Sequence, residues 1–169
     1  MMVTNSGEPD AITTLKCDLA AEVLRSSGNL RLQVTGWSML PSIMPGDTVM
    51  IERTHSEQVS TGDIILFHRE HRLFAHRVVA KTGRVGGVRI VTQGDGMAQP
   101  DPELNETELL GTVRFIVRNG KLLQPGKTLP FPQRAVAALV RRSPSAARFV
   151  AGIHGMRRSS PEPVHPCHN

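Results

Sequence analysis

Near the N-terminus the apolar positions recur three and four residues apart, the spacing of one face of an α-helix. They are Ile12, Leu15, Leu19, Val23 and Leu24. Asp10 precedes them as a candidate N-cap, and Gly28 follows them as a stop signal. The pattern predicts a helix over residues 10–28, after a flexible lead of residues 1–9.

From Leu30 onward the apolar residues come in short runs typical of β-strands. The expected strands are Leu30–Thr35, Thr48–Glu52, Asp63–His68, Leu73–Ala80, Val88–Thr92 and Leu110–Arg118. Gly-Asp, Asn-Gly and proline-rich segments separate them, as turns do. Six or seven strands in this stretch predict a mainly β domain over residues 29–124, a folded, barrel-like antiparallel sheet preceded by the N-terminal helix.

After Pro125 and Gly126 the composition changes, and residues 125–169 form a basic tail. Between Phe131 and Met156 apolar residues alternate with arginines, and Pro144 interrupts the pattern. We therefore expect at most two short basic amphipathic helices, followed by a disordered end.

Charge is distributed unevenly along the 169 residues, a length typical of one domain. Residues 1–118 hold 12 Lys/Arg and 14 Asp/Glu, a net of −2, whereas residues 119–169 hold eight and one, a net of +7. A polyanion-binding core is therefore not indicated, and no specific nucleic acid is expected as a partner. The basic tail could instead contact an anionic membrane surface.

Other classes of protein are also disfavoured by the sequence. No apolar run approaches the roughly 20 residues that cross a bilayer, and the N-terminus lacks the pattern of a signal peptide. We therefore expect a cytoplasmic or peripheral membrane protein. Cys17 and Cys167 are too few for a disulfide framework and lack zinc-site spacing, so no metal or cofactor is expected.

The best candidate nucleophile lies between the first two expected strands. The segment reads Gly36-Trp37-Ser38-Met39-Leu40-Pro41-Ser42-Ile43-Met44-Pro45-Gly46-Asp47. Its glycines and prolines predict a sharp turn, which can hold the Ser38 hydroxyl clear of the backbone and aim nearby N–H groups at a bound carbonyl. Taken alone, the segment is equally compatible with a surface loop. Asp47 and Asp63, each after a glycine, are interpreted as turn formers.

Four further blocks follow in order. They are residues 62–67 (Gly-Asp-Ile-Ile-Leu-Phe), 74–79 (Phe-Ala-His-Arg-Val-Val), 92–95 (Thr-Gln-Gly-Asp) with Asp101, and 110–113 (Leu-Gly-Thr-Val). Across residues 34–118 the sequence resembles the signal peptidase I family. It is most similar to the archaeal and endoplasmic-reticulum branch, which has histidine where the bacterial enzymes have lysine. The resemblance implies a serine endopeptidase with Ser38 as nucleophile and His76 as general base, acting on a precursor or exported peptide.

An imidazole has an unperturbed pKa of about 6.5 and can accept the serine proton near neutral pH. A carboxylate that orients it improves catalysis. Asp95 and Asp101 are the two candidates, and both also occur in ordinary turn sequences. The resemblance favours Asp101 as the orienting residue and leaves Asp95 as a structural or secondary partner. Arg77, next to the base, is expected to form a structural ion pair.

The sequence departs from the signal peptidase pattern around the oxyanion hole. Gly36 stands where that family usually has serine, and Trp37 replaces the usual glycine. The Ser38 N–H can still donate to an oxyanion, whereas the second donor is unidentified. Trp37 and Met39 are candidates for lining the substrate cleft. Two alternatives stay open: a LexA-type self-cleaving regulator, which the Gly-x-Ser-Met form also resembles, and a catalytically inactive binding module on the same scaffold.

Overall fold

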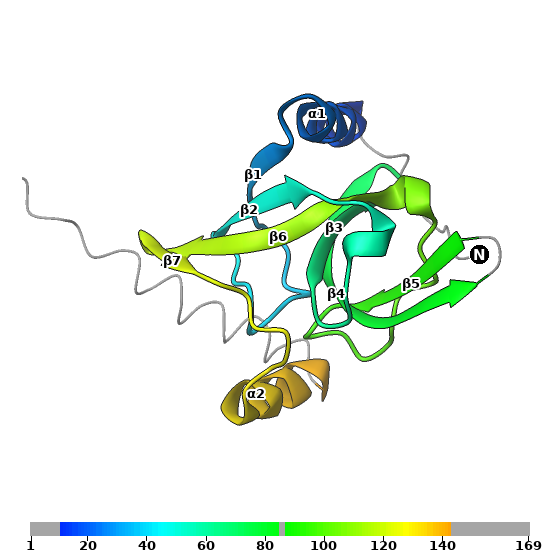
Figure 1. Ribbon diagram of the computed structural model, residues 1–169. Coiled ribbons are helices and arrows are strands. Elements are labelled where there is room, and N and C mark those ends of the chain that lie inside the picture. Colours follow the sequence, from blue (N-terminus) through cyan, green and yellow to red (C-terminus); the bar gives the residue numbers. More distant parts are fainter. Residues whose placement is uncertain (1–10, 85–86, 143–169) are drawn as a thin grey trace, which may run out of the picture.

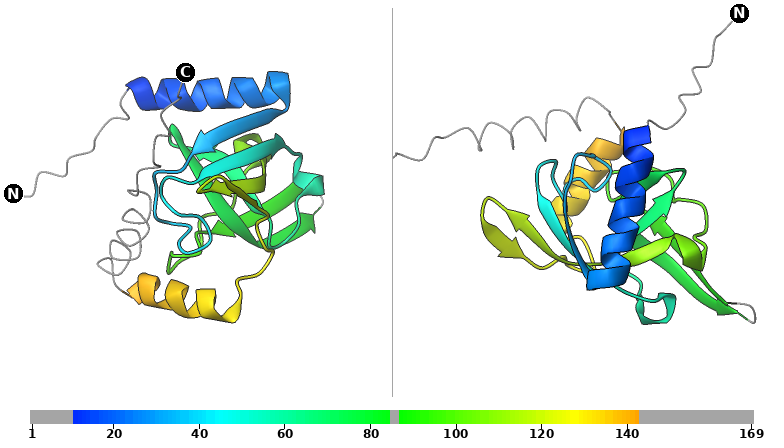
Figure 2. Two further views of the ribbon diagram at one scale, coloured as in Figure 1. Left: turned by 90° about the vertical axis from the view of Figure 1, so that its left-hand side faces the viewer. Right: turned by 90° about the horizontal axis from the view of Figure 1, so that it is seen from above.

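The computed structural model describes residues 11–84 and 87–142. An antiparallel sheet forms the body of the protein, and two helices lie at opposite ends of it (Figures 1 and 2). The helices are α1 (Ala11–Ser27) and α2 (Phe131–Arg142). The strands are β1 (Asn29–Gln33), β2 (Thr48–Arg53), β3 (Ile64–Arg69), β4 (Arg72–Arg84), β5 (Gly87–Gln93), β6 (Leu109–Arg118) and β7 (Lys121–Leu123). Two short 3₁₀ turns, Ser56–Gln58 and Glu106–Glu108, complete the order.

The strand order is β1-β2-β6-β3-β4-β5, with β7 added to β6. The sheet is folded but open, because β1 and β5 form its two edges without pairing to each other. The mainly β fold class predicted from the sequence is therefore confirmed. The sheet does not close into a barrel. All six predicted strands are present within a few residues of their expected bounds.

Strand β3 is the centre of the hydrophobic core, because it is buried on both faces. Ile64 and Leu66 belong to one cluster, which also holds residues of α1, β2 and β6. Ile65 and Phe67 point to the other face and pack with residues of β4 and β5. This follows from the alternation of side chains along a strand.

The β3–β4 hairpin has a two-residue turn in which both residues adopt positive φ, Glu70 at 49° and His71 at 59°. This is the conformation of a type I′ turn, whose twist matches that of the paired strands. The turn sets the register, which pairs Arg69 with Arg72 and, further along, Ile65 with His76. A bulge interrupts the pairing of β4 with β5 between Val78 and Ala80.

Helix α1 begins and ends close to the predicted positions, but its buried face differs from the apolar stripe in the sequence. Cys17, Ala20 and Leu24 are buried, whereas Leu15 and Leu19 are 68% and 61% exposed. The Cys17 thiol donates a hydrogen bond to the His71 carbonyl, 2.9 Å away, and so connects the helix to the β3–β4 turn. Burial, followed by the nearby Asp18 charge, raises the pKa of this thiol.

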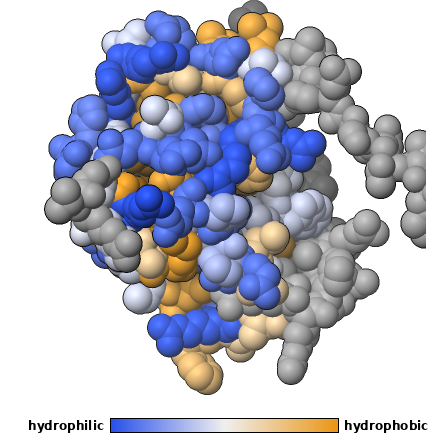
Figure 3. Space-filling model, turned by 90° about the vertical axis from the view of Figure 1, so that its right-hand side faces the viewer, coloured by the Kyte–Doolittle hydropathy of each residue, from blue (hydrophilic) through white to orange (hydrophobic). Residues whose placement is uncertain are grey.

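Helix α2 corresponds to the first of the two predicted basic helices and ends two residues before Pro144. The second of these helices, the flexible lead and the disordered end lie outside the described residues. Within the described residues no helix is long and apolar enough to cross a membrane. On the side of β4 and β5, hydrophilic residues cover most of the surface, with small hydrophobic patches between them (Figure 3).

Candidate active site

Ser38 lies in the turn that connects β1 to β2. The Leu40 N–H bonds to the Trp37 carbonyl at 3.1 Å, and the Ile43 N–H bonds to the Met39 carbonyl at 3.0 Å. Met39, Leu40 and Ile43 are buried, and the Leu40–Pro41 peptide bond is cis. The apolar residues after the serine therefore anchor the turn in the core, while Ser38 itself stays partly exposed.

Three predicted residues form a continuous hydrogen-bonded chain. His76 Nε2 lies 2.8 Å from Ser38 Oγ, and His76 Nδ1 lies 2.7 Å from Asp101 Oδ2. The serine and the histidine are 38 positions apart in the sequence, and the carboxylate is a further 25 along. The structure thus brings together the three residues that the sequence suggested as candidate nucleophile, base and orienting carboxylate.

The imidazole of His76 is held in place by its strand and by two aromatic rings. It projects from β4 and is only 3% exposed. The Phe67 and Phe74 rings each lie 5.8 Å from it, centroid to centroid, with Phe67 in an edge arrangement. This packing restricts the rotation of the ring, so that its two nitrogens stay aligned with Ser38 and Asp101.

Asp101 is positioned by Thr92, a residue whose role the sequence analysis did not identify. The fully buried Thr92 hydroxyl donates to Asp101 Oδ2 at 2.6 Å, and the Asp101 N–H donates to the Thr92 carbonyl at 2.7 Å. Burial raises the pKa of Asp101, but hydrogen bonds from His76 and Thr92, with the charge of Arg69, together hold it below its ordinary value. The carboxylate is therefore ionised at neutral pH and can accept the Nδ1 proton.

Asp95, the other candidate carboxylate, pairs with Arg77 rather than with His76. Arg77 Nε and Nη2 each lie 2.8 Å from an oxygen of Asp95, and the Ser42 hydroxyl also donates to this carboxylate. Arg77 further donates to the carbonyls of Gly62 and Gly126. The expected structural ion pair of Arg77 is present, and Asp95 is its partner.

Replacing Asp95 by asparagine should destabilise the protein by about 3–5 kcal/mol, because the buried Arg77 charge then lacks its counter-ion. The Arg77 and Asp95 side chains are only 10% and 4% exposed. The matched control is Glu52→Gln at the Glu52–Arg114 pair, whose side chains are about half exposed and where a loss of about 0–1 kcal/mol is expected. Urea unfolding measures both. Equal losses of unfolding free energy in the two variants would contradict the assignment of Arg77 and Asp95 as a buried ion pair.

Gly94 allows the loop after β5 to pack directly against the backbone of Ser38. A Cβ at this position would lie 2.5 Å from the Ser38 carbonyl oxygen and 2.7 Å from Met97 Cγ. The Gly96 N–H donates to the same Ser38 carbonyl at 2.8 Å. The backbone of Ser38 and the segment that leads to Asp101 are therefore held together.

Asp47 does more than form a turn. It is fully buried, accepts the Met44 N–H at 2.8 Å and pairs with Arg118 Nη2 at 2.7 Å. Arg118 also donates to the Ser42 carbonyl. Arg118 therefore clamps the serine-bearing segment from the end of β6, a role that sequence reasoning missed because the two residues are 71 positions apart.

The remaining predicted site residues, Gly36, Trp37 and Met39, line an apolar groove of about 750 Å³ beside Ser38. Trp37 is 43% exposed, whereas Met39 is almost fully buried and lies at the floor. Gly36 offers no side-chain donor for an oxyanion. Within the described part of the chain the Ser38 N–H makes no hydrogen bond, so it is free to donate to a bound carbonyl.

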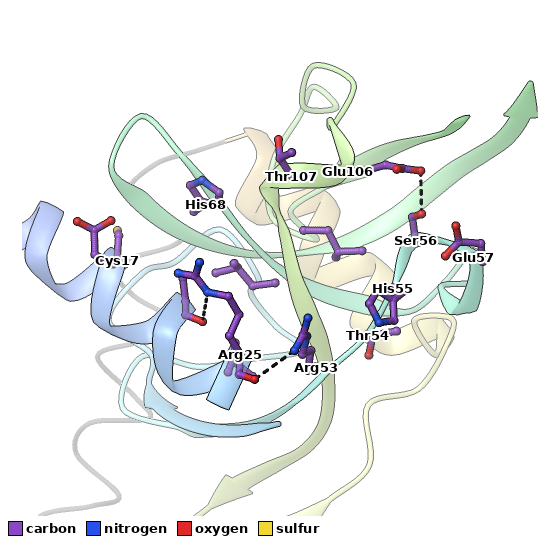
Figure 4. A pocket seen from close by; sticks show the side chains of 15 residues that line it. Cys17, Arg25, Arg53, Thr54, His55, Ser56, Glu57, His68, Glu106 and Thr107 are labelled. Carbon is purple, nitrogen blue, oxygen red and sulfur yellow. Dashed lines mark hydrogen bonds between the residues drawn. The ribbon is translucent and has the colours of Figure 1, made fainter. Parts of the chain in front are cut away.

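A second hollow, of about 440 Å³, lies on the other side of α1 and contains none of Ser38, His76 and Asp101 (Figure 4). Two hydrogen bonds join polar groups of its lining: Arg53 donates to the Arg25 carbonyl and Ser56 to Glu106. No cluster of three metal-ligating side chains exists in residues 11–84 and 87–142.

Residues 6–114, well over half of the chain, match the family described as Peptidase S24-like. This family lies in the superfamily of LexA and signal peptidase I, and the match does not select the histidine-type signal peptidase branch. No curated protein matches the sequence at a significant level. The chain belongs to the Peptidase S24-like family.

Proposed function

We propose that this protein is a serine endopeptidase in which Ser38 is the nucleophile, His76 the general base and Asp101 the residue that orients the base. One observation carries the proposal: the chain of hydrogen bonds from Ser38 Oγ through both nitrogens of His76 to Asp101, with distances of 2.8 and 2.7 Å. A serine within reach of an oriented base is the arrangement that activates a hydroxyl. Membership of a peptidase family supports the same class of reaction.

In the proposed mechanism His76 Nε2 accepts the Ser38 proton as Oγ attacks the peptide carbonyl. The Ser38 N–H donates to the developing oxyanion. His76 then protonates the leaving amine, and an acyl-enzyme forms. A water molecule, deprotonated by the same nitrogen, hydrolyses the ester and restores the serine. Asp101 accepts the Nδ1 hydrogen throughout and stabilises the imidazolium.

We propose that the substrate is a precursor or exported peptide supplied by another molecule, as the resemblance to histidine-type signal peptidases implies. The groove beside Ser38 supports this, because its volume of about 750 Å³ leaves room for side chains of an external peptide. The LexA-type alternative requires a DNA-binding helix-turn-helix before the serine. In the described residues α1 is the one helix before Ser38, and β1 follows it.

A fluorophosphonate probe, which reacts with activated serines, tests the proposal. We expect stoichiometric labelling of the wild-type protein and none of Ser38→Ala, because among the described serines Ser38 alone has a histidine at hydrogen-bonding distance. Ser60→Ala, which removes an exposed serine outside the site, is the matched control and should label like the wild type. Equal labelling of Ser38→Ala and Ser60→Ala, read by intact mass, would overturn the enzyme assignment. Time-dependent shortening of the wild-type chain would favour self-cleavage.

A further inference from the structure

The groove beside Ser38 has one wall that comes from α1. Leu19, Ala20 and Val23 line it on the helix side, and Leu30 and Leu32 of β1 line it on the sheet side. The floor and far side are the buried or half-buried apolar residues Met39, Ile43, Val49, Leu66, Leu73, Phe74 and Ala75. The Phe74 ring lies 5.8 Å from the His76 ring, centroid to centroid, and Ser38 itself lines the groove. The apolar surface therefore reaches two of the candidate catalytic residues.

Two large apolar side chains of the groove are exposed to solvent. Leu19 is 61% exposed and Trp37 is 43% exposed, and both line it. Leu15, on the same helix, is 68% exposed but does not line it. Leaving large apolar side chains in water is unfavourable, and their gathering around a concave site is a mark of ligand binding.

Among the described residues, the charged ones that line the groove are both basic. Lys16 and Arg72 are exposed and lie next to Cys17 and His71, the two residues whose hydrogen bond connects α1 to the β3–β4 turn. Two cations on the edge of an otherwise apolar groove favour a ligand with a carboxylate at that end.

We propose that α1 is part of the substrate-binding surface and determines specificity. The groove binds a peptide with one large aliphatic or aromatic side chain near the scissile bond and an acidic residue toward Lys16 and Arg72. This inference rests on the proposed peptidase function and names the class of substrate. A side chain as small as alanine would leave most of the 750 Å³ unfilled, so we expect a leucine to tighten binding about tenfold.

Binding to Ser38→Ala tests the inference separately from catalysis. Trp37, the only tryptophan of the chain, reports occupancy through its fluorescence. The probes are ten-residue peptides with blocked ends, built from Ala, Ser and Thr. One position is either Leu or Ala, and a second position, two to six residues away, is either Asp or Lys. We expect the Leu/Asp peptides to bind most tightly. Adding Leu19→Ser should weaken their binding about tenfold, whereas the matched control Leu15→Ser should leave it unchanged.

The charge preference has its own variant. Lys16→Glu combined with Arg72→Glu should reverse the order of the Asp and Lys peptides. Equal affinity of Leu and Ala peptides, or equal effects of Leu19→Ser and Leu15→Ser, would overturn the inference. The inference would also be overturned if peptides bind only after residues 2–9 are deleted. The same holds if sedimentation shows a dimer that the Leu/Asp peptides dissociate. Failure of the proposed function is detected separately, by the loss of Ser38-specific labelling.

Discussion

Changing His76 to alanine should lower kcat for peptide cleavage by about 10⁴–10⁶ while the protein stays folded, because Ser38 then loses the group that accepts its proton. The 2.8 Å contact between His76 Nε2 and Ser38 Oγ is the basis for this expectation. Cleavage of a quenched fluorescent peptide measures the rate, and circular dichroism verifies the fold.

The matched control for this experiment is His71→Asn. His71 is exposed in the β3–β4 turn, and asparagine tolerates its positive φ of 59°. We expect wild-type cleavage from this variant. A folded His76→Ala protein that cleaves as fast as His71→Asn would show that His76 is not the base.

The second large effect is expected at Asp101. Asp101→Asn should lower kcat about 10⁴-fold, because an amide can hold the imidazole in the wrong tautomer and cannot stabilise its positive charge. KM should change little, since Asp101 contacts His76 and Thr92 rather than the groove. Asp63→Asn is the control, because Asp63 accepts the Ser60 N–H and pairs with Lys127, and neither contact involves Ser38, His76 or Asp101. A higher KM with an unchanged kcat would contradict the orienting role of Asp101.

Much of the fold was predictable because the strands are short and regular. The six longer strands carry clear apolar runs, and turn residues separate them. Strand β7 was missed because its three residues are all exposed and show no alternation. On α1 the sequence showed the apolar positions but not which face is covered, since Cys17 and Ala20 are buried only through contact with the sheet.

The candidate site was predictable in part. Ser38, His76 and Asp101 were found by resemblance to a family, and not by spacing, because three segments distant in the sequence supply them. Local residue types could not separate Asp95 from Asp101, since both lie in turns. The structure separates them by their partners, Arg77 for one and His76 for the other. Arg118 could not be assigned, because its contact with Asp47 depends on how β6 ends beside the serine turn.

The alternation along β4 has a consequence for which insertions the protein can tolerate. His76 and Arg77 are consecutive, so they project from opposite faces of the strand, one toward the nucleophile and the other toward Asp95. Adding or deleting one residue between the two-residue turn and position 76 would exchange these faces, placing the guanidinium where the imidazole belongs. A change of one residue in length between residues 72 and 76 should therefore abolish activity.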